Sequence, residues 1–363
     1  MWSLSAERLA SRGAQVHVSV KDWGTSVREV ERLRSVGCRV FERPEPSLVQ
    51  RFSRRLFPRR SYAYEHVCAL GTGADLIVIS QGGNMDGLQW MEGAKSAGYK
   101  YAVISQSASE QWSVDDEQAE RLAACYESAC AAYFVSEANL SLTRQQFVTS
   151  LRHGRVVRNP FNVPYDARPA WPGDPALGLS LACVGRLDPF QKGQDVLFQV
   201  LNLAHWRTRN VRVSLVGSGM FERGLQRLAK DLKLSSVGFL GFVSDIEDVW
   251  SKHHALVLPS RFEGMPLALV EAMLCGRTCV VTDVAGHREL VRNGINGFLA
   301  QAPTVELLDA AMNRLWDARH NLKQMGATAA EDVRRWVSRD PVEDFVQHLV
   351  SLCGKTEDVP SMR

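Results

Sequence analysis

Apolar residues along the chain gather in short continuous runs, and segments with apolar positions at helical spacing separate these runs. Residues 75–80 and 101–106 are two such runs, and residues 115–130 form a helical segment that begins with an acidic turn. A continuous apolar run indicates a strand that is buried on both faces. The alternation of such strands with helices predicts parallel sheets built from repeated strand, helix, strand units.

A proline-rich connector divides this alternating pattern into two series. It opens at Asn159 and Pro160, contains four further prolines, and ends where an apolar run resumes at Leu179. Proline stiffens a linker and stops a helix from continuing, and 363 residues are enough for two domains. We therefore expect an α/β fold. Its expected divisions are a first Rossmann-like domain, a linker, a second Rossmann-like domain, and a C-terminal helix with a tail: residues 1–160, 161–178, 179–340 and 341–363.

Two carboxylates eight residues apart flank a predicted strand-to-helix turn in the second domain. Pro266 suits the first position of the helix, while Glu263 precedes that helix and Glu271 lies inside it. The first main-chain N–H groups of a helix lack partners within it and attract anions. We expect phosphate to bind the N–H groups of Gly264, Met265 and Leu267. Glu271 could then accept hydrogen bonds from vicinal hydroxyls such as those of a ribose, and Glu263 could contact a second sugar or developing positive charge.

A loop with two basic residues follows the first predicted strand of this domain. Arg186 ends the apolar run that starts at Leu179, and Lys192 follows within the same loop. A guanidinium can bind two phosphate oxygens at once, and a lysine supplies a mobile point charge. The position of both residues directly after a strand favours a site for a nucleoside diphosphate over two solvated side chains.

These two segments resemble the E-x7-E signature and the Gly-Arg-Leu to Lys-Gly loop of the retaining family 4 glycosyltransferases, also called glycosyl transferases group 1. The resemblance covers about residues 179–300 and is only general before them. It implies the GT-B architecture, in which two Rossmann-like domains face a cleft. It also implies transfer of a hexose from a nucleotide sugar with retention of configuration, without a cofactor and without a metal, because fixed cations neutralise the leaving diphosphate.

The resemblance assigns roles residue by residue. The strand at residues 211–216 ends in Gly217 and Gly219, where absent side chains let a ligand approach the main chain, and Val243 ends a segment that resembles the part of the family that holds the nucleotide base. The residues implied in catalysis are Glu263, Arg186 and Lys192. The residues implied in donor binding are Glu271, Gly264, Met265, Pro266, Leu267, Gly217, Gly219 and Val243. The helix at residues 342–352 is implied to return to the first domain.

The first domain offers a weaker set of candidates on the acceptor side. Many relatives carry a histidine at a strand end there, and Gln106 stands in what resembles that place. Glutamine can bind a sugar hydroxyl but cannot carry a proton at neutral pH. Asp86 and Gln106 belong to a polar cluster that could form an acceptor wall, although ordinary loop solvation explains it equally well. The cluster consists of Gln81, Asn84, Asp86, Gln106, Glu110 and Gln111.

The start of the chain departs from the family pattern. Residues 1–10 already have the pattern of a helix, whereas a family 4 chain opens with a strand and a glycine-rich loop. We therefore expect the central strand of the first sheet to be missing, and a late start or a truncated product explains this better than a natural short variant does. Without that strand, neighbouring strands would keep unpaired edges.

Composition limits the partners and the compartment. The net charge is only +3, so nothing requires a nucleic-acid partner. The eight cysteines show no C-x2-C spacing, which is typical of reduced thiols in a cytoplasmic protein. There is no apolar run long enough to span a membrane and no signal peptide. Residues 51–60 hold five arginines among apolar side chains, so weak association with an anionic membrane surface at its inner face is an alternative to a solvated loop.

We therefore predict a glycosyltransferase that moves a hexose from a nucleotide-sugar donor to a glycan or a lipid-linked acceptor in the synthesis of a cell-surface polysaccharide. Two alternatives stay open. A GT-B nucleotide-sugar epimerase would share diphosphate binding but needs acid and base residues at the sugar, and the sequence supplies Glu263 without a convincing partner base. A donor-binding module with impaired catalysis is the other alternative. A dinucleotide oxidoreductase is disfavoured because no strand leads into G-x-G-x-x-G.

Overall fold

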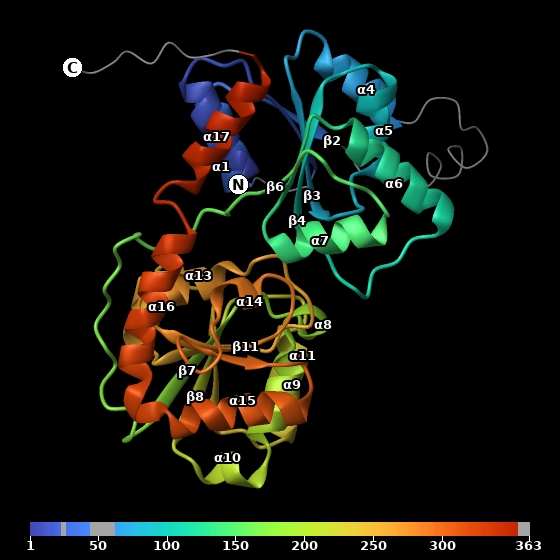
Figure 1. Ribbon diagram of the computed structural model, residues 1–363. Helices are drawn as coiled ribbons and strands as arrows, with labels where there is room; N and C mark the ends of the chain where they lie inside the picture. The colour runs from blue at the N-terminus through green and yellow to red at the C-terminus, as the bar shows by residue number, and fades with distance from the viewer. Residues whose placement is uncertain (23–26, 44–61, 355–363) are drawn as a thin grey trace.

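A computed structural model describes residues 1–22, 27–43 and 62–354 of the chain (Figure 1). The basic stretch at residues 51–60 lies outside these described residues. The two domains predicted from the alternating pattern are present, and both are built on parallel sheets, as the fold class requires. None of the described helices combines the length and the apolar character that crossing a membrane needs.

The C-terminal domain is built on one continuous sheet with the strand order β12-β11-β10-β7-β8-β9. All its neighbouring strands run parallel; Leu179 of β7 pairs with Val211 of β8, and Ala255 of β10 pairs with Thr278 of β11. The strands are β7 Leu179–Val184, β8 Val211–Val216, β9 Val237–Gly241, β10 Ala255–Leu258, β11 Thr278–Thr282 and β12 Phe298–Ala300.

Helices cover both faces of this sheet, so its central strands are buried on both sides. One apolar core joins the sheet to α9, α11 and α15, and another joins it to α12, α13 and α16. The helices of this domain are α8 Pro189–Lys192, α9 Gln194–Leu201, α10 Ala204–Thr208, α11 Glu222–Asp231, α12 Ile246–Lys252, α13 Leu267–Leu274, α14 His287–Leu290, α15 Val305–Asp317, the 3-10 helix Arg319–Asn321 and α16 Leu322–Trp336.

The N-terminal domain contains two separate parallel sheets among its described residues. One has the order β1-β2 and the other has the order β3-β4-β5-β6. The strands are β1 His17–Lys21, β2 Arg39–Arg43, β3 Ile77–Gly83, β4 Tyr101–Ser107, β5 Ala131–Phe134 and β6 Gly154–Val156, and the helices are α1 Trp2–Ser11, α2 Arg28–Ser35, α4 Tyr62–Gly71, α5 Leu88–Ser96, α6 Asp116–Ser128 and α7 Glu137–Gln146. In the described part of the chain, β1 pairs only with β2 and β3 pairs only with β4. The expected loss of a central strand at the start of the chain stays a prediction.

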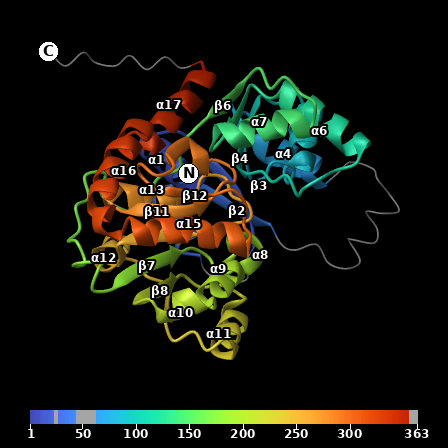
Figure 2. The same cartoon turned by 60° about the horizontal axis from the view of Figure 1, so that its bottom comes forward.

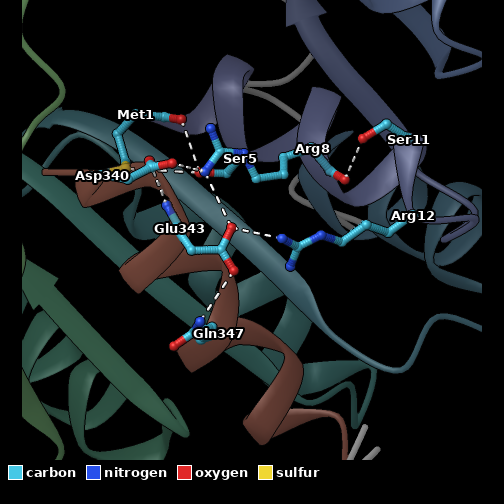
Figure 3. A network of polar contacts seen from close by, with 8 residues as sticks. All are labelled: Met1, Ser5, Arg8, Ser11, Arg12, Asp340, Glu343 and Gln347. Carbon is cyan, nitrogen blue, oxygen red and sulfur yellow. Dashed lines mark hydrogen bonds and ion pairs between the residues drawn. The ribbon is translucent and has the colours of Figure 1, made fainter. Parts of the chain in front are cut away.

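The last helix, α17 (Pro341–Leu352), leaves the C-terminal domain and lies beside α1 in both views (Figures 1 and 2). Phe345 of α17 packs edge-on against Tyr133 of β5, with ring centroids 5.0 Å apart. Figure 3 shows the polar part of this contact: the Arg8 guanidinium pairs with Asp340 at 2.5 Å, and Arg12 pairs with Glu343 at 2.7 Å. Such exposed ion pairs add little stability individually, so the apolar packing of Phe345 is the main contribution.

Candidate functional site

The strand-to-helix turn between β10 and α13 buries the first of the two predicted carboxylates. Glu263 is 4% exposed, and its Oε1 atom lies 2.5 Å from Lys192 Nζ and accepts a hydrogen bond from Ser260 Oγ at 2.8 Å. Lys192 ends α8, which precedes a left-handed turn at Gly193. A side chain at Gly193 would lie 2.0 Å from the Pro259 carbonyl oxygen, so glycine is what lets this loop approach the turn. Two residues predicted separately therefore form one ion pair.

A hydrogen-bonded chain beneath this pair holds the turn in place. Thr282 Oγ1 donates to the Ser260 carbonyl at 2.6 Å, and the Thr282 carbonyl lies 2.5 Å from Nδ1 of His287. Because a carbonyl only accepts, Nδ1 carries the proton. His287 is fully buried, which lowers the pKa of its imidazole and keeps it neutral, and its Nε2 atom has no hydrogen-bond partner in the described structure. His287 could not be selected from the sequence, because an isolated histidine after a turn belongs to no motif.

Main-chain donors lie beside the ion pair. Helix α13 begins at Leu267, and Pro266 is its N-cap residue, one position earlier than the sequence predicted. The N–H groups of Gly264, Met265 and Leu267 donate to no acceptor within the described residues. An anion placed there would meet these donors and the positive end of the helix dipole.

Arg186 is exposed at the carboxyl end of β7 and its guanidinium contacts a neutral side chain. Its Nη2 atom donates to Gln191 Oε1 at 2.9 Å, and Gln194 holds the Arg186 carbonyl at 2.8 Å. In the described part of the chain no carboxylate pairs with this guanidinium. Its charge is therefore available to a ligand.

Glu271, the second carboxylate, is buried near the middle of α13. Its Oε1 atom accepts hydrogen bonds from the Asn162 main-chain N–H at 2.9 Å and from Asn162 Nδ2 at 2.8 Å. Burial raises the pKa of the Glu271 carboxyl above its ordinary value, and the hydrogen bonds from Asn162 act against that rise. The sequence did not predict Asn162, since it lies in the linker, more than 100 residues before its partner.

Gly217 and Gly219 make room for a neighbouring loop. A Cβ atom at Gly217 would lie 2.1 Å from the Gly185 carbonyl oxygen, and one at Gly219 would lie 2.3 Å from the Leu187 carbonyl oxygen. These glycines therefore allow the loops after β7 and β8 to pack together, and a role at a ligand stays a prediction. Val243, half-buried, packs on the core of the domain just after β9.

The predicted acceptor wall in the N-terminal domain is only partly at the surface. Gln81 and Asn84 are buried: Gln81 Nε2 donates to Ser105 and Tyr126, and Asn84 Nδ2 donates to Thr143 and Gln146. These two side chains bind other residues of their own domain. Asp86 is exposed and accepts from the Gly83 N–H, and the half-buried Gln106 accepts from Asn159 Nδ2 at 2.8 Å.

The two domains meet at the turn that carries Glu263. A side chain at Gly264 would place Cβ 1.8 Å from the Gln106 carbonyl oxygen, so only glycine permits this contact. The ring of Phe262 packs edge-on against Trp112, with centroids 5.2 Å apart. Gln106 therefore lies at the same junction as the Lys192 and Glu263 pair.

No metal site accompanies these charges: within the described residues, no three histidine, cysteine or acidic side chains come together in a way that could hold an ion. Lys192 is the cation that pairs with Glu263 in the turn.

Comparison with known proteins agrees with this geometry. Residues 178–318 match the family described as Glycosyl transferases group 1. The chain is similar to the D-inositol 3-phosphate glycosyltransferase of Streptomyces griseus, with 31% identity over 59% of this chain and 48% of that protein. It is also similar to the UDP-Gal:alpha-D-GlcNAc-diphosphoundecaprenol alpha-1,3-galactosyltransferase of Escherichia coli, with 37% identity over 22% of this chain and 20% of that protein. The chain thus spans less than half the length of these curated relatives.

The fold has a match over almost its whole length. The crystal structure of Anabaena Alr3699/HepE in complex with UDP-glucose has a TM-score of 0.73, with 19% sequence identity, and covers 96% of this chain and 95% of that one. At this identity the likeness establishes the fold, which is the GT-B arrangement of two Rossmann-like domains. The segment that matches Glycosyl transferases group 1 contains Arg186, Lys192, Glu263 and Glu271.

Proposed function

We propose that the protein is a glycosyltransferase that transfers a hexose from a nucleotide sugar with retention of anomeric configuration. The observation that carries this proposal is the Lys192 and Glu263 ion pair, at 2.5 Å, beside the free N–H groups that begin α13. Fixed positive charge and a carboxylate at one place match what departure of a nucleoside diphosphate from a sugar requires.

The leaving diphosphate is the group that this site is suited to stabilise. Arg186, Lys192 and the N–H groups of Gly264, Met265 and Leu267 together present charge and hydrogen-bond donors where negative charge develops. The departing phosphate in turn supplies negative charge near an oxocarbenium-like sugar and can accept the proton of the acceptor hydroxyl. These fixed cations do the work that a metal ion would do on a diphosphate.

The two carboxylates take different roles in this proposal. Glu263 orients the donor sugar, because it is held from below by Ser260 and next to the cation that binds the phosphate. Glu271 accepts from the ribose hydroxyls, with Asn162 holding one of its oxygens. Neither acts as a covalent nucleophile.

The acceptor is proposed to be a glycan or a lipid-linked sugar, approaching from the side of Gln106 and Asp86, and the pathway to be cell-surface polysaccharide synthesis. The support is that one relative is named for transfer to a diphosphoundecaprenol-linked sugar and that a structural relative was crystallised with UDP-glucose. We further propose that the enzyme works in the cytoplasm, with contact to the inner face of the membrane.

A panel of nucleotide sugars tests this proposal. The full chain is incubated with each donor, alone and with short glycan acceptors, and release of nucleoside diphosphate is followed with the anomeric configuration of the product by NMR. The proposal predicts diphosphate release with an α-linked product from an α-linked donor. Conversion of the donor sugar to its epimer would favour an epimerase, and tight binding without any turnover would favour a binding module.

A further inference from the structure

The first turn of α7 in the N-terminal domain reaches across to the turn that carries Glu263. Ser136 is the N-cap residue of α7 and accepts from the Asn139 main-chain N–H at 3.1 Å. The side chain of Asn139, 1% exposed, then extends to the C-terminal domain. Its amide nitrogen lies 3.4 Å from the Glu263 carbonyl oxygen and 3.4 Å from the Ala108 carbonyl oxygen.

The link between the domains holds for either orientation of the Asn139 amide. With the amide turned over, its nitrogen lies 3.3 Å from the Gly264 carbonyl oxygen and its oxygen lies 3.0 Å from the Ala108 N–H. In both cases the amide joins residue 108 of one domain to residue 263 or 264 of the other. Among the described residues, no other side chain of the N-terminal domain hydrogen-bonds to the turn at residues 259–266.

Neighbouring contacts fix α7 at this place. The Ala138 N–H donates to Glu289 Oε1 at 3.1 Å, which puts a carboxylate of α14 at the positive end of α7. The second oxygen of Glu289 pairs with Arg158 at 3.4 Å, and the Arg158 guanidinium lies 3.3 Å from the ring centre of Trp336. Glu289 and Trp336 belong to the C-terminal domain, so these contacts hold the first turn of α7, and with it Asn139, against that domain.

We propose that Asn139 is a positioning residue that couples the meeting of the two domains to the placement of the Glu263 carboxylate. This inference rests on the proposed function, because it takes Glu263 as the group that orients the donor sugar. From the side of the C-terminal domain the turn is held by Ser260, by Thr282 and by the Gly286 N–H, which donates to the Gly264 carbonyl at 3.2 Å. Asn139 adds the hydrogen bond from the opposite domain and completes the support.

The test combines hydrogen exchange with kinetics on the full chain. In Asn139→Ala and Asn139→Asp, amide exchange in the peptide covering residues 260–270 should become about fivefold faster, the change expected for one lost hydrogen bond. The aspartate variant keeps the size of Asn139 and an oxygen that can accept from Ser136 Oγ, but it loses the amide donor to the turn, so it separates the contact with the turn from the contact within α7. Turnover of the nucleotide sugar should fall about tenfold in both variants, with its KM changed less than twofold.

Asn84→Ala is the matched control, because Asn84 is an equally buried asparagine whose side chain donates to Thr143 and Gln146 of the same domain. It should speed exchange within residues 84–147 and leave residues 260–270 unchanged. Unchanged exchange at residues 260–270 in both Asn139 variants would overturn the inference, and so would faster exchange with unaltered turnover. A wild-type chain that turns over no nucleotide sugar would refute the function, whereas the exchange result would still decide whether Asn139 holds the turn.

Discussion

The two sides of the domain junction differ in how their polar residues are used. On the C-terminal side, Lys192, Glu263 and the first N–H groups of α13 converge at one place, and Arg186 has no carboxylate partner among the described residues. On the N-terminal side, Gln81 and Asn84 turn inward and bind residues of their own domain. Under the proposed function, the charged groups of the donor site already converge on the C-terminal side, whereas the proposed acceptor side presents few groups, chiefly Asp86 and Gln106.

The sheets of the two domains also differ, and the C-terminal domain again has the more continuous arrangement. The sheet of the C-terminal domain is continuous, with helices on both faces. The N-terminal domain has two separate sheets in the described part of the chain. A continuous parallel sheet fixes the ends of its strands relative to one another, which suits residues that must hold a diphosphate.

Gly264→Ala should have the largest effect, since it acts where the two sides meet. The added Cβ atom would lie 1.8 Å from the Gln106 carbonyl oxygen and 2.6 Å from Val135 Cγ2, so the domains could no longer approach as they do. A displacement of this size at a reacting centre costs about a hundredfold in rate, measured as turnover of the donor in the presence of acceptor. Gly224→Ala is the control, because nothing lies within 4 Å of its added Cβ and alanine is favoured in a helix. Full activity of Gly264→Ala would show that the contact is not needed.

Glu263→Gln should reduce turnover by about 10- to 100-fold, the range for loss of a hydrogen bond to a charged group. Glutamine keeps an oxygen for Ser260 but removes the charge that pairs with Lys192. Affinity for the nucleoside diphosphate should change little, because Lys192 stays available to phosphate. The variant is compared with wild type by steady-state kinetics and by calorimetry. A loss of nucleotide affinity with turnover spared would reverse the assigned roles of the two carboxylates.

Glu271→Gln should weaken nucleotide binding by about 1 kcal/mol, or about fivefold, because a neutral oxygen replaces a charged acceptor for the ribose. The same substitution should not lower the free energy of unfolding and should raise it if it changes it. The pKa of Glu271 is raised in the folded protein, so ionising this carboxyl costs folding free energy as the pH rises through its ordinary value of 4.5 and through the raised value. The variant lacks that cost. Its free energy of unfolding at pH 7 should therefore equal or exceed that of the wild type, and the advantage should disappear below pH 4.5.

The opposite pattern in denaturant titrations, a Glu271→Gln variant that is less stable than wild type only at neutral pH, would contradict this account of Glu271. It would mean that the ionised carboxylate stabilises the fold through Asn162 more than its burial costs.

Asp86→Asn should have the smallest effect and should be confined to the acceptor. Asparagine keeps an oxygen for the Gly83 N–H, so the turn after β3 stays intact. The KM for the acceptor should rise about two- to fivefold, as expected for an exposed charged contact, while hydrolysis of the donor without acceptor stays unchanged. A change in donor hydrolysis would place Asp86 on the donor side instead.

The sequence predicted the fold class because it depends on local spacing. The structure brings Glu263 and Lys192 from two separate motifs into one ion pair, and their roles at a ligand stay a prediction. Glu263 and Lys192 lie in two short motifs at the ends of neighbouring strands, and parallel strands bring their carboxyl ends to one edge of a sheet. The fold class followed from the same alternation of apolar runs and helical segments, and the continuous sheet of the C-terminal domain confirms it.

Other residues could not be predicted because their partners lie far away along the chain. Asn139 and Asn162 hydrogen-bond to residues more than 100 positions later, and neither belongs to a local motif. In the polar cluster of the N-terminal domain, the sequence offered a candidate whose side chain turns inward. The cluster has the composition of a binding wall, but Gln81 hydrogen-bonds to Ser105 and Tyr126 in the interior. Composition indicates which side chains are polar and leaves open whether they bind each other or a ligand.

The most direct test of the central claim is a calorimetric titration of nucleoside diphosphates with the wild-type chain and with Arg186→Ala. UDP, GDP, ADP and CDP are each titrated, and the tightest is carried to the variant and to a control, Arg227→Ala, which removes an exposed arginine of α11. Because Arg186 is exposed and pairs with no carboxylate among the described residues, its removal should leave the fold intact. Arg186→Ala should weaken binding by about 1.5–3 kcal/mol, and the Arg227→Ala control should bind as tightly as wild type. Equal affinity in wild type and Arg186→Ala, or no binding of any nucleoside diphosphate, would contradict a donor site at this edge of the sheet.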